Sequence, residues 1–500
     1  MPSRRRRPSP AAMVAGSAPG AGDRDRGPCR EECEEAMVGG DTRFAPGTAR
    51  SALAHHSFRT LFVGAFLSNI GTWMQQVVLG AFAYELTGSA TFLGVLVFAQ
   101  LGPTLLLGPV SGLIADVVDR RKLLIGLSIE QLLAAVALAA IVSTDDPSRT
   151  AMALVVLAAG IGSSVFMPAY SALLPALVGR GDLPGAISLN SAQLNASRVI
   201  GPAIGGIAYA AVGPGWVFLA NALSYLFVIA AVARVTMPAV PAPDGERGWR
   251  KLTLGFRVAR TDRVVGRALV TITVFSFFSL LWVGQMPVVA AENLGIDEDS
   301  SAYGFFYGAF GVGAVVGSLA IGTVFARRSN AQLVRVGLAV YAVLLAAFAL
   351  LRTPALAYPM VLLVGATYFG AITALNTAMQ SRLADNERGR VMGLWMMGFG
   401  GTVALSNLAF GPVIDQIGMR PVMLFGAVVA AVLGWRVADV RTPEELGAAA
   451  VNPVGGGTPR PRHRRRRSPR RRLTVQRSGV VIVVPFSHSL LCPAYLDADR

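Results

Sequence analysis

The chain contains a succession of apolar stretches, each long enough to cross a lipid bilayer as a helix. A bilayer core of about 30 Å requires about 20 mostly apolar residues per helix. We predict twelve such helices, at residues 60–85, 91–115, 123–142, 151–178, 186–211, 217–238, 268–289, 303–326, 333–351, 356–381, 391–415 and 421–440. Charged residues make up only 15% of the chain, against about 25% in water-soluble proteins. The predicted fold class is therefore an all-α polytopic membrane protein.

Lysine and arginine are distributed unequally between the predicted loops. The loops after even-numbered helices hold 16 of these residues, whereas the loops after odd-numbered helices hold 3. By the positive-inside rule, the basic loops face the cytoplasm. Because the number of predicted spans is even, both termini are predicted to be cytoplasmic.

The longest basic loop divides the predicted spans into two groups of six, which show weak internal similarity around Gly213 and Gly418. Transporters built from repeated halves hold their substrate near the bilayer midplane, between the halves. The sequence thus predicts a disordered cytoplasmic extension, a six-helix half, a basic cytoplasmic loop, a second six-helix half and a disordered arginine-rich cytoplasmic tail, at residues 1–57, 58–238, 239–267, 268–440 and 441–500.

The basic residues favour no nucleic-acid partner. The net charge is +16, but 43 of the 45 basic residues are arginines, a bias that a GC-rich genome explains. All cysteines and histidines lie outside residues 58–440. We therefore expect no metal site and no cofactor within the membrane.

The segment after the second predicted span combines a glycine, an aspartate and a basic cluster, namely Gly112, Asp116, Arg120 and Arg121. It resembles the cytoplasmic loop signature of the major facilitator superfamily. The glycine allows two helices to approach closely, and the aspartate can cap a helix or pair with an arginine. The resemblance implies contacts that close the cytoplasmic side in one state and break in the other. The alternative is a positive-inside anchor.

The fifth predicted span carries an arginine followed by a Gly-Pro-x-x-Gly-Gly run, comprising Arg198, Gly201, Pro202, Gly205 and Gly206. The run resembles the antiporter motif of the same superfamily, which is associated there with exporters. Glycines permit close packing, and an internal proline bends a helix. The alternative is ordinary packing of small residues.

Further segments, beginning at Ser68, Tyr84 and Glu387, extend this resemblance. Over residues 58–440 the chain resembles the bacterial secretion effectors that include enterobactin-exporter-like proteins. Asp119 departs from the usual loop pattern, which often has glycine there. The corresponding loop of the second half, residues 322–328, has no acid.

In this family, helices 1, 4, 7 and 10 line the central cavity. The resemblance therefore implies a candidate substrate cavity formed by Asn69, Thr72, Gln76, Tyr170, Trp282, Gln285, Thr373, Asn376 and Gln380. On the first and tenth spans these residues follow i, i+3, i+7 spacing, which places each set on one helical face. Aromatic and amide groups suit amphipathic organic molecules. The alternative is that they hydrogen-bond neighbouring helices together.

Charged side chains inside a bilayer are costly and therefore candidates for function. Glu130 and Arg198 lie well inside predicted spans, and we predict that they carry the proton- or substrate-linked switch, as candidate partners. Glu85 and Asp415 lie at span ends, where helix caps or interface contacts are expected.

The motifs together favour a secondary transporter. Neither lysine lies in a Gly-x-x-x-x-Gly-Lys-Ser/Thr motif, so no nucleotide-binding subunit is implied, and no catalytic constellation indicates an enzyme. We predict a multi-pass protein of the bacterial cytoplasmic membrane that exports small amphipathic organic molecules (a drug, siderophore or secondary metabolite) in exchange for protons. Uptake by the same fold and a non-transporting receptor or scaffold are the alternatives.

Overall fold

The computed structural model describes residues 44–171, 173–235 and 249–436, with the side chains at 106, 108–117, 180, 249–254, 385 and 386 left undescribed. All regular secondary structure within these ranges is helical. Most of the N-terminal extension predicted at 1–57 and all of the tail predicted at 441–500 lie outside the described residues.

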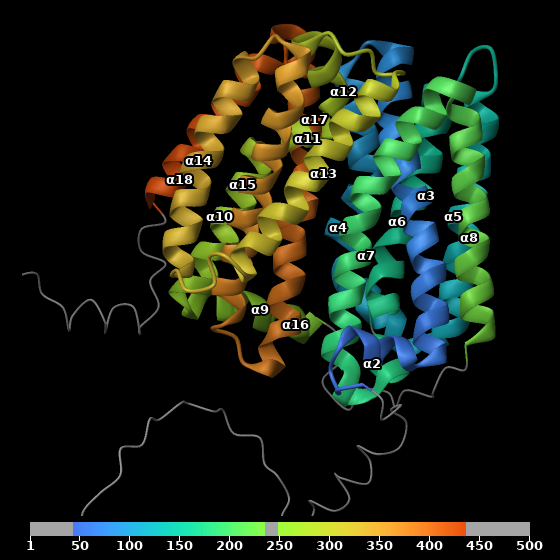
Figure 1. The fold of residues 1–500 in the computed structure, drawn as a ribbon, viewed down its shortest axis with the longest axis vertical. Helices are drawn as coiled ribbons and strands as arrows, with labels where there is room; N and C mark the ends of the chain where they lie inside the picture. Colours follow the sequence, from blue (N-terminus) through green and yellow to red (C-terminus); the bar gives the residue numbers. More distant parts are fainter. Residues whose placement is uncertain (1–43, 172, 236–248, 437–500) are drawn as a thin grey trace, which may run out of the picture. The chain divides into compact units, whose positions relative to one another are not determined.

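The first half consists of six long helices (Figure 1), and glycines mark several of their boundaries. Gly88 ends one helix with a φ of 57°, a left-handed conformation that favours glycine, and Asp119 caps the N-terminus of another. The helices are α3 (His56–Thr87), α4 (Ala90–Val117), α5 (Arg120–Val142), α6 (Arg149–Ser171), α7 (Leu174–Val212) and α8 (Pro214–Arg234).

The second half is less regular, because two of its predicted spans are interrupted. The seventh span comprises α10 (Arg263–Ser279), α11 (Leu281–Gly284), α12 (Met286–Val288) and the π-helix η1 (Val289–Leu294). The eleventh comprises α16 (Asp385–Met396), the π-helix η2 (Met397–Gly401) and α17 (Thr402–Ile417). The remaining helices are continuous and comprise α13 (Ser301–Gly322), α14 (Asn330–Leu350), α15 (Pro354–Gln380) and α18 (Met419–Arg436).

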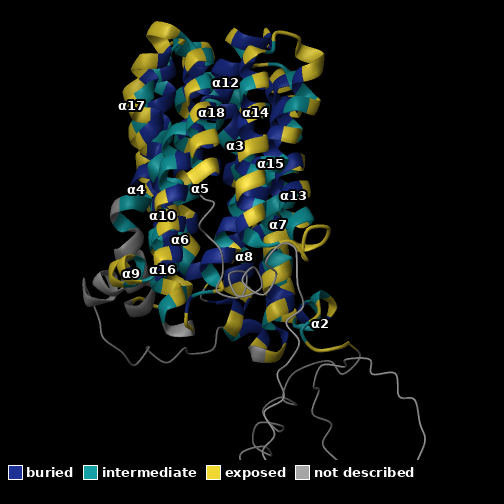
Figure 2. Ribbon diagram, turned by 90° about the vertical axis from the view of Figure 1, so that its left-hand side faces the viewer, coloured by how far each residue is buried: buried dark blue, intermediate teal, exposed yellow. Residues whose placement is uncertain are grey.

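Eight helical stretches in the described part of the chain are long and apolar enough to cross a membrane. Large apolar side chains remain exposed on them, including Leu133 at 59% and Trp435 at 79%. Figure 2 shows that exposed positions recur along the helices, and many of them are large apolar residues. This pattern is what a lipid environment requires, and the chain is a multi-pass membrane protein.

Within each half, glycines bring helices into backbone contact. A Cβ atom built on Gly317 of α13 would lie 1.9 Å from the carbonyl oxygen of Ala366 on α15, and Gly160 of α6 meets Ala99 of α4 in the same way. Because apolar helices gain little from burial against lipid-like surfaces, such close packing supplies much of their association.

The two halves meet mainly along two helix pairs, α4 with α17 and α7 with α13, and α4 also contacts η2. Gly206 of α7 faces Gly304 of α13 so closely that a Cβ atom on Gly206 would lie 2.5 Å from the Cα atom of Gly304. We call the α4–α17 contact and the α7–α13 contact together the seam. They involve the N-terminal parts of α4 and α13, and therefore lie at the end of the bundle that holds the turn at Gly88.

Three predicted boundaries are wrong. Residues 44–57 are not all disordered, because α2 (Ala49–Ala54) begins at the Thr48 cap and buries Ala52 beside Phe58. The loop predicted at 239–267 includes the helix α9 (Trp249–Thr261), which packs against α16, and the start of α10. The loop expected at 179–185 is helical apart from Gly179, whose φ of 71° marks a kink in α7.

The close approach of α7 and α13 predicts a position-specific effect of glycine replacement. Gly304→Ala places a methyl group 2.6 Å from the Cα atom of Gly206 and should lower the stability of this arrangement by about 1–3 kcal/mol. The melting temperature of the purified protein in detergent would measure this loss. Gly322→Ala, on the same helix but with no neighbouring atom within 4 Å, is the matched control. Equal melting temperatures for the two variants would contradict the packing described.

Candidate functional site between the two halves

A carboxylate of the second half caps a helix of the first. Asp415 of α17 accepts hydrogen bonds from the backbone N–H groups of Ala90 at 2.6 Å and Thr91 at 3.1 Å, the first residues of α4. The hydroxyls of Ser89 and Thr91 donate to the same side chain. An acid at this position satisfies unpaired N–H groups and interacts favourably with the helix dipole. Asp415 is thus a cap, as predicted, and it joins the two halves.

Other polar contacts reinforce this end of the seam. The side-chain amide of Gln285 donates to the carbonyl oxygen of Ala90 at 3.1 Å, and the Tyr84 hydroxyl donates to Glu292 at 2.9 Å. Gln285 is fully buried, so it joins the halves instead of lining a cavity as predicted. Glu85, the other predicted cap or interface residue, accepts a hydrogen bond from Tyr209 within the first half.

Further along the helices, the two halves meet around a cation. The Arg198 guanidinium carbon of α7 lies 5.1 Å from the ring centroid of Trp73 on α3 and 4.7 Å from that of Phe369 on α15. Each ring presents a negative face to the guanidinium. Since Trp73 belongs to the first half and Phe369 to the second, Arg198 contacts both.

Three of the predicted cavity residues instead stabilise the interior of one half. Tyr170 is 5% exposed, stacks on Phe166 and accepts a hydrogen bond from Gln193. Trp282 is 1% exposed and donates to the Tyr341 hydroxyl at 3.0 Å. Thr72 contacts the Tyr225 hydroxyl of α8 at 3.1 Å. Hydrogen bonds within one half hold these three residues, which is the alternative that the sequence left open, and their place in a substrate cavity stays a prediction.

The remaining cavity candidates divide into two sets. Asn69 and Gln76 are half-buried on α3, and together with Trp73 they follow i, i+4, i+7 spacing on one face. On α15, Thr373 lies 3.5 Å from the Ser318 hydroxyl, and Gln380 donates to Asn376. The five remaining candidates are all half-buried, and they lie on α3 and α15, the two helices that carry the rings beside Arg198.

Glu130 lies apart from Arg198. Its carboxylate accepts a hydrogen bond from the neighbouring Gln131. The same carboxylate packs against α6, where a Cβ atom built on Gly162 would lie 2.0 Å from its oxygen. The outer surface beside it is a shallow apolar groove between α5 and α6, lined by Ile129 and Leu133. Arg198 instead contacts Trp73 and Phe369, so among the described residues the predicted pairing of Glu130 with Arg198 is not found.

The antiporter-like glycines serve two different interfaces. Gly201 and Gly205 of α7 lie against Trp73 and Met74 of α3, whereas Gly206 faces the second half. Pro202 lies inside α7, and its carbonyl oxygen is within 2.7 Å of a Cβ atom built on Gly304. The glycine run therefore brings α7 close to α3 and α13 at once.

Part of the predicted gating motif cannot be placed. The side chains of Gly112 and Asp116 lie outside the described residues. Arg121, at the start of α5, donates a hydrogen bond to the carbonyl oxygen of Ala233 near the end of α8, and Arg120 also interacts. The arginines of the motif thus lie at the end of the first half that is opposite to the seam.

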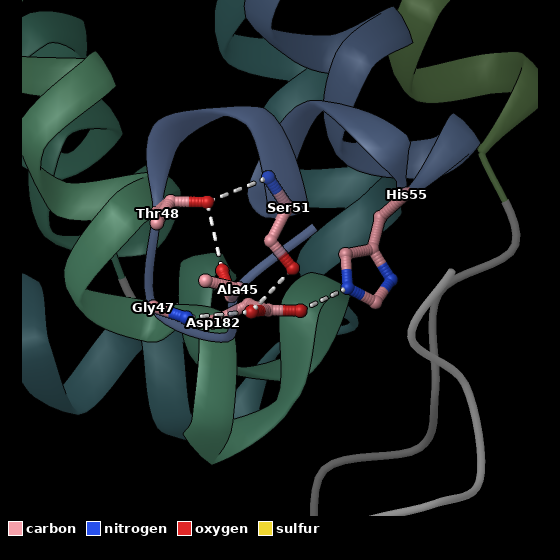
Figure 3. Close-up of polar contacts among 6 residues, drawn as sticks. All are labelled: Ala45, Gly47, Thr48, Ser51, His55 and Asp182. Carbon is pink, nitrogen blue, oxygen red and sulfur yellow. Dashed lines mark hydrogen bonds and ion pairs between the residues drawn. The ribbon is translucent and has the colours of Figure 1, made fainter. Parts of the chain in front are cut away.

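A polar cluster at that opposite end was not predicted from the sequence (Figure 3). Asp182, which is 7% exposed, accepts hydrogen bonds from the Gly47 N–H at 2.9 Å and the Ser51 hydroxyl at 2.7 Å. Its other oxygen lies 2.8 Å from the His55 ring. These contacts hold residues 44–55 against α7. The available sequence signal was Thr48 itself, a residue type favoured at the N-cap of a helix.

The ionisation of Asp182 follows from these contacts. Burial raises its pKa, but the hydrogen bonds from His55, Gly47 and Ser51 outweigh burial and lower the pKa below its ordinary value of 3.8. Asp182 is therefore a carboxylate at neutral pH, and it stabilises the docked segment as an anion.

Two bundles of membrane helices that join around a polar seam define a membrane transporter of the major facilitator class. The family model described as transmembrane secretion effector matches residues 47–456. The chain therefore belongs to the transmembrane secretion effector family of the major facilitator superfamily, which comprises transporters and not enzymes, as the sequence motifs had predicted.

Curated relatives support this assignment. The chain is 25% identical over 364 residues to the staphyloferrin A transporter of Staphylococcus aureus (strain NCTC 8325 / PS 47), covering 72% of this chain and 89% of that protein. It is 27% identical over 360 residues to the enterobactin exporter EntS of Escherichia coli O1:K1 / APEC, covering 68% and 81%.

Solved structures share the fold at low sequence identity. A bacterial homologue of the iron transporter ferroportin in an inward-facing state superimposes with a TM-score of 0.60, at 16% identity, covering 77% of this chain and 98% of that one. The nucleoside transporter NupG gives a TM-score of 0.59 at 14% identity, with coverage of 77% and 99%.

The cap formed by Asp415 predicts how the seam responds to mutation. Asp415→Ala removes a cap worth about 0.5–2 kcal/mol and should open this end more often. We expect a cysteine at the buried position Ala90 to react several-fold faster with a membrane-impermeant maleimide in Asp415→Ala protein. Asp299→Ala, which removes an exposed acid from a nearby loop, is the control. Unchanged labelling would show that the cap does not hold the seam.

The Asp182 cluster predicts a defined pH dependence. Because the pKa is lowered on folding, the contribution of the carboxylate is full above the ordinary pKa of 3.8 and is lost as pH falls through the lower, folded-state value. Docking of α2 should thus persist at pH 5 and weaken only below 3.8. Hydrogen exchange of residues 49–54 measures it.

The matching variant is Asp182→Asn, which should accelerate that exchange at pH 7 by on the order of tenfold or more, because hydrogen bonds to charged groups are worth about 1.5–3 kcal/mol. Ser51→Ala removes one neutral donor and should have a smaller effect. Equal, unaltered exchange in both variants would disprove the role of Asp182.

Proposed function

We propose that this protein exports small amphipathic organic molecules, siderophores among them, by alternating access of two six-helix halves. The observation that carries the proposal is the seam, in which the halves of a secretion-effector protein join at one end around Asp415 and Gly206. The names of the relatives supply the direction and the substrate class, since one is an exporter of enterobactin and another a transporter of staphyloferrin A.

The proposed topology has twelve spans with both termini in the cytoplasm, and halves at 58–238 and 268–440. In its favour, every predicted span coincides largely with helix, including those that do not number among the eight long apolar ones. The excluded helix α3 carries Asn69, Gln75 and Gln76, and a lining helix needs such polar residues. The basic segment 239–267 would then connect the halves on the cytoplasmic side.

In alternating access, contacts between the halves close one end of the bundle in one state and the other end in the other state. The contacts at each end must therefore be able to form and break. At the seam end, the contacts between the halves are one aspartate cap, a few hydrogen bonds and glycine packing, which together can be broken without unfolding either half. At the opposite end, we assign the second closure to the motif containing Gly112, Asp116, Arg120 and Arg121. The seam would then face the outside of the cell in an inward-open state.

Energy for export would come from protons moving inward. Glu130 is the candidate proton carrier, because one of its oxygens is buried without a hydrogen-bond partner on the α5–α6 interface. Its distance from the seam implies that protonation would act through the packing of α6, which also contacts α4.

Export can be tested in paired strains with and without the gene. Cells that contain the protein should secrete more of the exported compound. Purified protein in liposomes should move enterobactin or staphyloferrin A against its gradient when a pH gradient is imposed. Glu130→Gln should abolish the pH-driven component and leave passive exchange intact. Asp145→Asn, which alters an exposed loop acid, is the control.

Each alternative would leave a distinct result. Accumulation of the compound inside cells would indicate uptake, and the absence of exchange across a panel of siderophores and drugs would indicate a receptor or scaffold. Full pH-driven transport by Glu130→Gln would exclude this residue as the proton carrier.

A further inference from the structure

Arg198 occupies an environment that is costly for a cation. Its guanidinium lies between helices of both halves and is half-buried at mid-length on α7. Removing a charge from water is unfavourable unless other groups compensate for the lost hydration. The rings of Trp73 and Phe369 supply part of this compensation through cation–π contacts.

These rings leave the hydrogen-bonding capacity of the guanidinium unused. Arginine has five N–H donors and no acceptor, whereas phenylalanine has no polar group and the indole of tryptophan only donates. Among the described residues, the Arg198 side chain interacts with aromatic groups and with no carboxylate. The expected candidate, Glu130, contacts Gln131 and Gly162 instead.

The surroundings of Arg198 combine flat apolar surfaces with amides. Phe369 belongs to an aromatic cluster in which its ring centroid lies 4.3 Å from that of Tyr368, and Tyr368 stacks on Phe310 at 6.0 Å. Asn69 and Gln76 lie on the same face of α3 as Trp73, one turn before and one turn after it. Both are half-buried, and so is Trp73.

We infer that Arg198, with Trp73 and Phe369, forms a binding site for a planar organic anion, namely an aromatic carboxylate carried between the two halves. The inference rests on the proposed transport function and specifies its substrate class. A carboxylate fits the guanidinium because it accepts two parallel N–H hydrogen bonds, and a flat ring fits beside Trp73 and Phe369. The amides of Asn69 and Gln76 can bond further polar groups of the ligand.

The position of the site links binding to the change of state. Arg198 and Trp73 move with the first half and Phe369 with the second, so rearrangement of the halves must alter this three-residue contact. When the halves rearrange and the rings of Trp73 and Phe369 move apart, Arg198 loses one of its two cation–π contacts. A bound anion would neutralise the guanidinium and so take the place of the lost contact. The site is therefore expected to prefer an anion in every state that exposes Arg198.

The test compares two ligands that differ in charge and share a shape. Full-length protein in detergent is titrated with 2-naphthoate and with its neutral analogue 2-naphthamide, and binding is followed by calorimetry. We expect 2-naphthoate to bind at least tenfold more tightly, since hydrogen bonds to charged groups are the strong ones. Equal affinities, or no binding of 2-naphthoate at millimolar concentration, would overturn the inference.

Variants locate the site. Arg198→Gln should reduce the affinity for 2-naphthoate at least tenfold and leave that for 2-naphthamide unchanged. Arg198→Lys should give an intermediate affinity, because it keeps the charge and loses the two-pronged geometry. Arg335→Gln, which removes an exposed arginine of α14, is the control and should bind both ligands as the wild type does.

Folding and transport are separated from binding by design. Should Arg198→Gln aggregate, Arg198→Lys and the wild-type ligand pair still decide the question, and full 2-naphthoate affinity in a folded Arg198 variant would refute the site. The assay needs neither a pH gradient nor a direction of transport. Charge-selective binding without export would therefore retain the site and reject the transport proposal, whereas export with charge-independent binding would do the reverse.

Discussion

Lipid offers no hydrogen-bond partner to the backbone, so a chain that crosses the membrane must satisfy its N–H and carbonyl groups within helices. Because lipid is as apolar as leucine, those helices must then associate by close packing and a few polar contacts. The contact of Gly206 with Gly304 and the cap that Asp415 forms on α4 are the two kinds of contact available. The joint between the halves is consequently narrow and specific.

A joint of this kind is compatible with the proposed alternation between an inward-open and an outward-open conformation. One buried apolar cluster runs through both halves and includes Met74 and Phe218 of the first half together with Trp282 and Tyr341 of the second. A rearrangement of the halves would therefore have to separate apolar contacts as well as the polar contacts of the seam. The Asp415 cap is suited to exchange, because the N–H groups of Ala90 and Thr91 can be satisfied by water when the seam separates.

Hydrophobic periodicity located the helices well, because membrane helices satisfy their own backbone and need little tertiary context. It failed where tertiary contacts decide. Tyr170 and Trp282 are polar enough to suggest a cavity, yet their hydrogen-bond partners Gln193 and Tyr341 lie in the same half, which no spacing rule reveals. Helix α2 was missed because its stability depends on Asp182, more than 120 residues away in the sequence. The stripe on α3 stays a prediction: Asn69 and Gln76 flank Trp73 on one face, while Thr72 contacts Tyr225 of α8.

Arg198 shows why the most informative residue was also the hardest to interpret from sequence. A charge inside a predicted span indicated function, but its predicted partner was Glu130, and the fold places that residue against α6, on another face of the first half. The actual neighbours, Trp73 and Phe369, are ordinary aromatic residues in the sequence and become a cation site only when α3, α7 and α15 converge. Two rings can tolerate a guanidinium without neutralising it. At the proposed binding site, the remaining positive charge at the junction of the halves would favour an anionic ligand over a neutral one of the same shape.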